Sequence, residues 1–187
     1  MTNEKIHIGH SKSKAAPAIK NSRIESCEVI IHGASKSLIS KTVFENCTIK
    51  CKRAKSHNFK LVQFISCKFF GSLEGSVLGS ADLENEGFEA KISNCDFSEL
   101  KMNLVDFRHG LEIETCKMPP WPHVTFERTN DSRPELKALD LPLRVARMLG
   151  AKVLGEKNYY VYDLSKYDCD LEHAKEVISQ SDYATSN

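Results

Sequence analysis

Apolar side chains recur at a step of five residues over much of the first two thirds of the chain. The first run holds Ile19, Ile24, Val29, Ala34, Ile39, Phe44, Ile49, Ala54, Phe59, Phe64 and Phe69. The step returns later, with one inserted residue, in Ile92, Phe97, Met102, Phe107, Ile113 and Met118. An α-helix needs apolar residues about every 3.6 positions, and a half-buried strand needs every second one. The pattern therefore predicts neither a helix nor a flat strand.

A cysteine-centred hexapeptide is superimposed on this step. It reads apolar, any residue, a small polar residue, Cys, any residue, apolar, and it is centred on Cys27, Cys47, Cys67, Cys95 and Cys116. The first three copies lie 20 residues apart, which is four steps of five. Four steps describe one turn of a square coil with one inward side chain on each side. We expect residue i to lie about 4.8 Å from residue i+20, with hydrogen bonds as in a parallel sheet.

The fold predicted for residues 19–118 is therefore mainly β, a right-handed quadrilateral parallel β-helix of about five coils. The five cysteines named above would form one internal column, in which a thiol acts as a small apolar filler. An antiparallel sandwich with a strand every ten residues is the alternative. The unbroken five-residue step argues against the sandwich, because such strands have a period of two.

Residues 19–118 resemble the pentapeptide-repeat family, whose unit reads small residue, Asp or Asn, Leu or Phe, and two polar residues. Segment 95–99 reads Cys-Asp-Phe-Ser-Glu and segment 105–109 reads Val-Asp-Phe-Arg-His, which both fit. The copies at Cys27, Cys47 and Cys67 lack the Asp or Asn. The resemblance implies a quadrilateral right-handed helix of short strands. Some members protect DNA gyrase by imitating duplex DNA, a role that implies a strongly acidic rod, unlike this near-neutral chain.

The remaining segments predict a polar leader over residues 1–18, an inserted loop at about 71–89 and a small α+β capping annex over 119–187. Four glycines fall in the loop segment, where the cysteine spacing also rises from 20 to 28 residues. Glycine permits the left-handed turns through which a chain leaves and rejoins a coil. Prolines 119, 120 and 122 then end the repeat, and Trp121 between them is expected to close the coil.

Short helices and a hairpin are expected in the annex. The run Ser-Arg-Pro-Glu at 132–135 has the spacing of a capping box and begins the first helix. The second helix places Leu143, Ala146 and Leu149 on one apolar stripe and ends at Gly150. We expect a hairpin over residues 152–162, a last helix over about 171–180 with an apolar stripe, and fraying over 183–187.

Composition places the chain in a soluble class. It has 187 residues, 41% hydrophobic and 27% charged, with a formal net charge of +1, which is typical of one domain. We expect a cytoplasmic protein without a membrane segment, because no apolar run reaches about 18 residues and the N-terminus lacks a signal-peptide core. Seven cysteines are an odd number, so free thiols in a reducing compartment are expected rather than a disulfide framework.

Charge is distributed unevenly along the coil. Residues 21–68 hold nine Lys/Arg and three Asp/Glu, a net of +6, whereas residues 69–118 hold four and ten, a net of −6. Such polarity steers charged partners, although solubility of a repeat surface explains it equally well. The candidate partner-binding residues are a basic run and two acidic loop residues, namely Lys50, Lys52, Arg53, Lys55, Glu84 and Glu86.

No catalytic, cofactor-binding or metal-binding motif is present in the sequence. The prediction is a non-enzyme, a protein-binding module of the immunity or antitoxin type that neutralises or shields a macromolecular partner such as a toxin. It would take no cofactor, and an open coil end would allow self-association. One alternative is a β-helix enzyme acting on carbohydrate. The other is nucleic-acid binding through a winged-helix-like annex, which a net charge of −2 over residues 119–187 disfavours.

Overall fold

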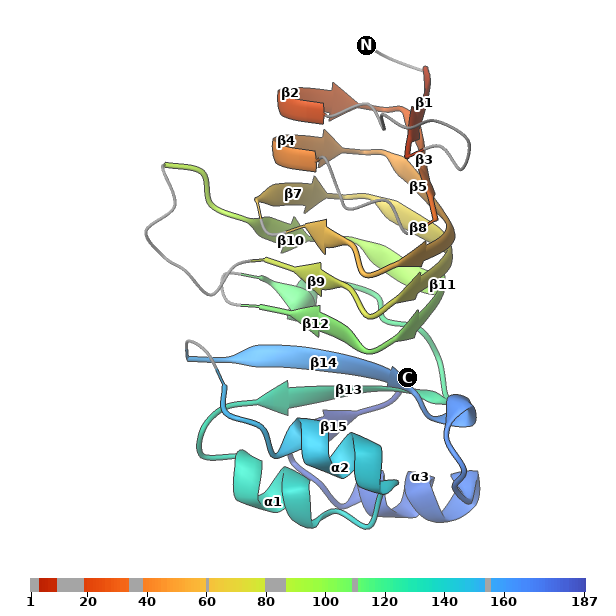
Figure 1. Cartoon of the computed structure of the whole chain (residues 1–187), viewed down its shortest axis with the longest axis vertical. Helices are drawn as coiled ribbons and strands as arrows, with labels where there is room; N and C mark the ends of the chain where they lie inside the picture. The colour runs from red at the N-terminus through yellow and green to blue at the C-terminus, as the bar shows by residue number, and fades with distance from the viewer. Residues whose placement is uncertain are drawn as a thin grey trace.

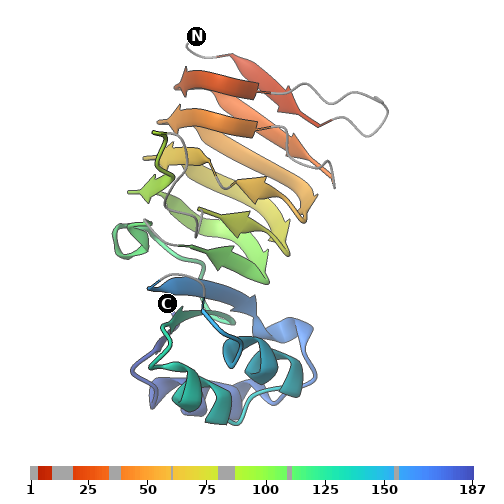
Figure 2. The ribbon, with the colours of Figure 1, turned by 60° about the vertical axis from the view of Figure 1, so that its left-hand side comes forward.

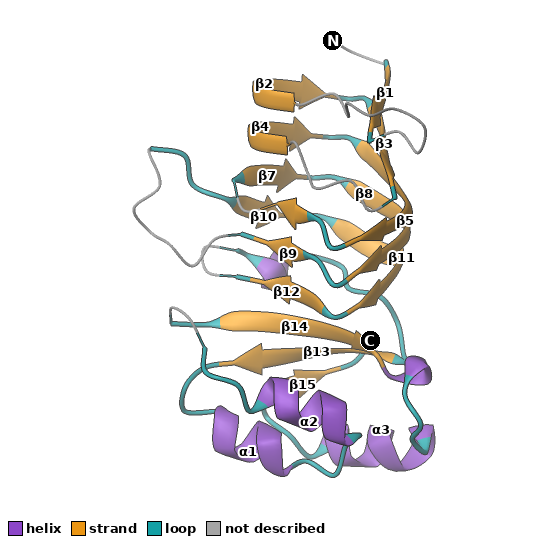
Figure 3. Cartoon of the chain, viewed as in Figure 1, coloured by secondary structure: helices purple, strands orange, loops and turns teal. Residues whose placement is uncertain are grey.

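The computed structural model describes residues 4–9, 19–33, 39–59, 61–79, 87–108, 111–153 and 156–187. The fold is mainly β, as expected, with parallel strands stacked along the long axis and helices gathered at the C-terminal end (Figures 1 and 3). The strands form three sheets, here called sheets A, B and C, and the chain visits them in turn as it advances along the axis (Figure 2).

Sheets A and B are wholly parallel. Sheet A has the order β1 (Lys5–Ile8), β3 (Glu28–His32), β5 (Thr48–Lys55), β8 (Lys68–Glu74) and β11 (Asp96–Asn103). Sheet B has the order β10 (Lys91–Ser93), β7 (Val62–Ile65), β4 (Ile39–Glu45) and β2 (Ile19–Glu25). Parallel strands need long crossovers, and here each crossover is a passage through the other sheets.

The register places residues 20 apart beside each other. In sheet B Ile24 pairs with Phe44, which pairs with Phe64. In sheet A Val29 pairs with Ile49, which pairs with Phe69. These six side chains are buried in one core, with the rings of Phe44 and Phe64 stacked 5.3 Å apart. The five-residue step is therefore a row of inward positions, each stacked on its counterpart in the next passage.

Left-handed backbone marks the corners between sheets. The residue before each of Cys27, Cys47, Cys67 and Cys95 has φ between 52° and 53°, in Ser26, Asn46, Ser66 and Asn94, at the passage from sheet B to sheet A. The passage from sheet A to sheet C has the same feature in Ser56, Gly75 and Leu104. Small polar residues and glycine dominate these corners because they tolerate positive φ at low cost.

The loop predicted for residues 71–89 begins later in the chain than expected. Strand β8 continues to Glu74 and is followed by β9 (Val77–Leu78), which pairs with β6 (Asn58–Phe59) in sheet C. The repeat loses one residue here, so that Leu73 pairs with Ala54 across a bulge in β5. That missing residue breaks the five-residue step without ending the coil. Only residues 80–86 within the predicted loop lie outside the described part.

Sheet C joins the stacked strands to the annex. β12 (Val105–Phe107) is parallel to β9 on one side and antiparallel to β14 (Asn158–Asp163) on the other. β14 then pairs with β13 (His123–Arg128), and β13 pairs with β15 (Ala184–Thr185). Tyr159 and Val161 of β14 contribute to the core of the stacked strands. The expected hairpin over residues 152–162 is wrong, because β14 takes its partners from β12 and β13.

Three helices cover the end of the annex, namely α1 (Arg133–Ala138), α2 (Leu143–Leu149) and α3 (Leu171–Ser179). The 3-10 turns are η1 (Ile113–Thr115) and η2 (Leu164–Lys166). The expected stripe of the second helix is wrong, because α2 buries Val145 and Leu149 while Leu143 is exposed. The expected fraying over 183–187 is also wrong, since β15 pairs with β13 there. Trp121 packs in the annex core rather than closing the coil.

Candidate partner-binding surface

The structure divides the predicted basic run between two faces. Lys50 lies on the outer face of sheet A and forms an ion pair with Glu28, which also pairs with Lys5 at 2.9 Å. Hydrogen bonds from Lys50 and Lys5 lower the pKa of Glu28 to about 2. Lys52 is exposed on the same face. The charge of Lys50 is therefore offset by a neighbour, and this residue is a poor candidate for a partner contact.

The second half of the run lies at the corner between sheets A and C. Arg53 is exposed and has a φ of 55°, at the bulge where β5 shifts its register against β8. Lys55 at the end of β5 pairs at 2.9 Å with Glu74 at the end of β8.

Glu74 lies close to cations from three separate elements. The hydrogen bond from Lys55 lowers the pKa of this carboxyl, and the positive charges of Lys166 on η2 and Arg144 on α2 lower it further. One carboxylate among three cations leaves a local excess of positive charge. The tertiary fold thus joins the predicted basic run to two annex residues that sequence analysis did not select.

Helix α2 adds an exposed face to this corner. Leu143 is 65% exposed and Met148 is 39% exposed, and these are the exposed large hydrophobic residues among the described positions. Arg144 and Arg147 lie on the same face and are also exposed. We call the set the composite basic surface, which consists of Arg53, Lys55, Glu74, Leu143, Arg144, Arg147, Met148 and Lys166.

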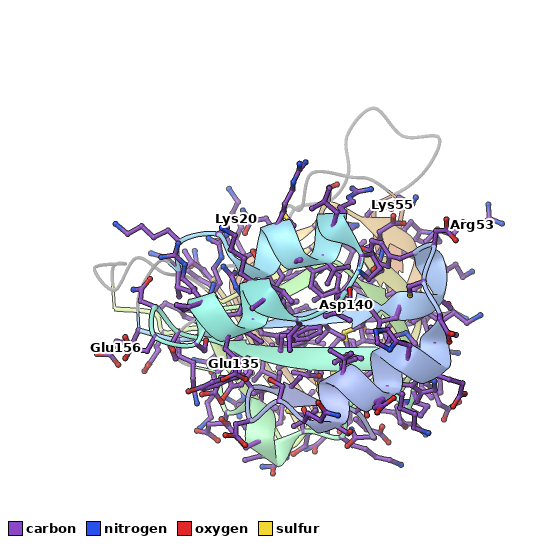
Figure 4. All side chains as sticks on the ribbon, turned by 90° about the horizontal axis from the view of Figure 1, so that it is seen from below. Lys20, Arg53, Lys55, Glu135, Asp140 and Glu156 are labelled. Carbon is purple, nitrogen blue, oxygen red and sulfur yellow. The ribbon has the colours of Figure 1, made fainter. Side chains whose placement is uncertain are left out.

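Seen along the long axis, Arg53 and Lys55 lie toward the right of the view, Glu135 and Glu156 lie toward the left, and Asp140 lies between them (Figure 4). Arg144 carried no signal in sequence analysis beyond a helical pattern, and Lys166 carried none. Their proximity to Lys55 depends on how the annex packs against the stacked strands, which no local motif encodes.

The other predicted residues lie elsewhere. Glu84 and Glu86 lie outside the described residues. The expected cysteine column is represented by Cys27, Cys47, Cys67 and Cys95, which are buried, and by Cys116, which is half-buried. In the described ranges no group of three or more His, Cys, Asp or Glu side chains is arranged to hold a metal ion. No helix within these same ranges is long and apolar enough to cross a membrane.

Self-association concerns the edge strands of the sheets. In the described part of the chain β1 and β2 at one end, and β10 and β11 at the other, each have a strand partner on one side. The annex strand β14 occupies the edge of sheet C by pairing with β12. Association through a coil end stays a prediction.

Buried polar residues fix the annex beneath this surface. Arg128 is only 1% exposed, and its guanidinium donates to the carbonyl oxygens of Leu149 and Ala151 at the end of α2. The same guanidinium lies 4.5 Å from the ring centre of Tyr160. A cation at a helix C-terminus interacts favourably with the helix dipole. Arg128 therefore holds the C-terminal end of α2, and with it the orientation of Arg144 and Arg147.

No family model, curated protein or solved structure matches this chain.

Proposed function

We propose that the chain is a pentapeptide-like, right-handed quadrilateral β-helix that works as a rigid, non-catalytic binding scaffold in the cytoplasm. The register of 20 residues and the left-handed corners support this description. A stacked parallel core moves little on binding, so its surface is presented already formed. The most concrete version is an immunity or antitoxin type of protein that occludes the surface of a toxin.

The partner fitted by the composite basic surface is a protein with an acidic face around an apolar centre. The observation that carries this proposal is the ion pair of Lys55 with Glu74 at 2.9 Å, beside which the positive charges of Lys166 and Arg144 lower the pKa of the same carboxyl. Leu143 and Met148 supply the apolar part of the surface. Arginine and methionine are enriched in protein interfaces, and buried anchors of this kind contribute most of the binding energy.

The alternatives have weaker support. A winged helix presents its hairpin beside the recognition helix, whereas β14 lies inside sheet C between β12 and β13. A glycosidase needs two convergent carboxyl groups. Several carboxylates on the strands are instead paired with lysine or arginine, for example Glu28 with Lys50 and Glu99 with Lys68.

The test compares retention of host proteins by immobilised full-length variants. We expect the wild type to retain one stoichiometric acidic protein, and Arg144→Glu or Lys166→Glu to weaken its binding roughly 10- to 30-fold. Glu74→Gln should not weaken it, because the change removes the only acid of the surface. All three residues are exposed or partly exposed, so unfolding free energies should stay within about 0.5 kcal/mol of the wild type.

Lys117→Glu is the matched control. Lys117 is exposed and pairs through its backbone with Asp96 at the start of β11, whereas the composite basic surface adjoins the other end of sheet A. This variant should bind like the wild type. Equal losses from Lys117→Glu and Arg144→Glu would contradict the proposed location. Retention that a nuclease abolishes would replace the protein partner with nucleic acid.

A further inference from the structure

The cysteines of the repeat form a hydrogen-bonded set. Cys47, Cys67 and Cys95 each donate the thiol to a carbonyl two residues earlier and to another on the preceding passage of the chain. Neighbouring thiols along this column shift each other's pKa, from Cys47 through Cys67 and Cys95 to Cys116. The parallel bridge between Asp96 and Lys117 places Cys95 and Cys116, one residue before each, in register as neighbours.

Cys116 is the accessible end of this set. The other four members are at most 3% exposed, whereas Cys116 is half-buried. Its side chain lines an open hollow of about 580 Å³ together with Ser98, Lys117, Met118, Pro120 and Asn187. A small oxidant can therefore reach Cys116 from solvent, and Cys95 lies directly behind it.

The neighbouring Cys95 side chain lowers the pKa of Cys116 to about 7, against the opposing effect of burial. The protonated Cys116 thiol donates to the carbonyl oxygen of Glu112 at 3.7 Å. The hydroxyl of Thr115, 3.9 Å from the sulfur, also lowers the pKa. The same arrangement raises the pKa of Cys95, which stays a thiol. The attacking species in cysteine oxidation is the thiolate.

We propose that Cys116 is a peroxide-sensitive site and that Cys95 resolves its oxidised form into a disulfide across the last passage of the coil. The Cys116 thiolate attacks hydrogen peroxide, so that an S–O bond forms and the O–O bond breaks, and hydroxide leaves. The Cys95 thiol then transfers its proton to the sulfenic hydroxyl as its sulfur attacks the sulfenic sulfur. An S–S bond forms, the S–O bond breaks, and the Cys95 proton leaves with the hydroxide as water. Two thiols and one peroxide give one disulfide and two waters.

The backbone around the pair supports this bond. The N–H of Lys117 donates to the carbonyl of Cys95 at 2.8 Å, and the N–H of Phe97 donates to the carbonyl of Lys117 at 2.7 Å. Neighbouring parallel strands hold facing Cα atoms about 4.8 Å apart, which lies inside the range of about 4.4–6.8 Å found for disulfides. The pair therefore needs a side-chain rotation rather than a movement of the backbone.

Cys169 is the matched internal comparison. It is half-buried like Cys116 but lies in the annex, where its thiol donates to the carbonyl of Leu164. Burial and the charges of Asp168 and Asp170 raise its pKa. If exposure alone determined reactivity, Cys116 and Cys169 would be oxidised at similar rates. The proposal instead predicts that Cys116 is oxidised faster.

The experiment treats the reduced full-length chain with hydrogen peroxide and follows intact mass and cysteine-containing peptides. We expect the mass to fall by two hydrogen atoms, a peptide pair joined through Cys95 and Cys116, and modification of Cys116 roughly tenfold faster than that of Cys169. Cys169→Ser should behave like the wild type, and Cys116→Ser should form no such disulfide. In Cys95→Ala, dimedone should trap a sulfenic acid on Cys116.

Other outcomes would overturn the proposal. First modification at Cys169, equal rates at the two residues, or a first disulfide between another pair would each do so. If Cys95→Ala does not fold, the peptide map of the wild type and the comparison of Cys116→Ser with Cys169→Ser still decide the question. Oxidation that begins only in denaturant would show that the hollow gives no access to Cys116.

Discussion

Corner residues decide which substitutions this chain tolerates. Non-glycine residues with positive φ recur at equivalent positions, and they include Arg53 and Leu104 as well as the expected Asn and Ser. An L-residue in the left-handed region costs about 1 kcal/mol. This cost is offset because the hydrogen bonds of the sheets fix the chain on both sides of each corner. Gly71, with a φ of 94°, combines this conformation with a close approach to the neighbouring strand.

Gly71→Ala should destabilise the chain far more than Gly33→Ala. A Cβ at Gly71 would lie 2.1 Å from the carbonyl oxygen of Cys51, so the backbone of β5 would have to move. A Cβ at Gly33, where φ is 53°, would have nothing within 4 Å. We expect a loss of about 1 kcal/mol for Gly33→Ala and at least about 3 kcal/mol for Gly71→Ala. Chemical denaturation measures both, and equal losses would contradict the close approach.

His57 should make stability depend on pH near neutrality. The side chain is 1% exposed, its Nε2 lies 2.6 Å from the carbonyl oxygen of Gly33, and its buried Nδ1 has no partner. Burial lowers the pKa of His57 below its usual 6.5. Because the pKa of His57 is lower in the folded state than in the unfolded state, its contribution to the free energy of unfolding is complete above pH 6.5. That contribution is lost as the pH falls from 6.5 toward the folded pKa.

The comparison variant is His57→Phe, which keeps an aromatic ring against Phe59 and removes the titration. Unfolding free energies of both proteins would be measured between about pH 7.5 and 5. The advantage of the wild type over the variant should shrink as the pH falls. Parallel curves would show that His57 does not titrate between the folded and unfolded states.

At the scale of elements, strand β14 decides how the annex relates to the coil. Its residues alternate, so that Tyr159 and Val161 enter the core of the stacked strands while Tyr160 and Tyr162 face the annex core. The aromatic residues are evident in the sequence, where they predict a local hairpin. The alternation is also visible, but its partners are 30 or more residues away on β12 and β13. Pairing over that distance depends on loop closure and packing, which local pattern does not determine.

Helix α2 shows the same limit. Its bounds and the role of Gly150 follow from the sequence, and the structure places the end of the helix there. The buried face of α2 cannot be derived from the sequence, because the helix has two possible apolar stripes, one with Leu143 and one with Val145, next to Leu149. The structure buries the stripe with Val145 against the annex core and leaves Leu143 beside Arg144 on the surface. The candidate binding surface exists because of that choice.

At the scale of the whole molecule, sheet C makes one folding unit of parts that sequence analysis treated as two. A chain ending at Met118 would lose β14, leave the edge of β12 unpaired and uncover the core that Tyr159 and Val161 complete. We expect this truncated chain to aggregate or remain unfolded, whereas the full chain folds cooperatively. Size-exclusion chromatography and circular dichroism measure this. A folded monomer from the truncated chain would show that the annex is dispensable.

The sequence by itself determined the rows of inward side chains in the stacked parallel strands. The five-residue step and the cysteines recur because each passage of the chain packs between two equivalent passages. The same inward positions must therefore be filled by similar side chains. β9 was not predicted because one residue is missing from the repeat near Gly71. In the sequence alone, this shift of the five-residue step looks like the end of the repeat. The tertiary structure alone decided which residues meet across the junction with the annex. Lys55, Glu74, Arg144 and Lys166 lie on four elements, and their convergence depends on packing between segments that have no periodic relation.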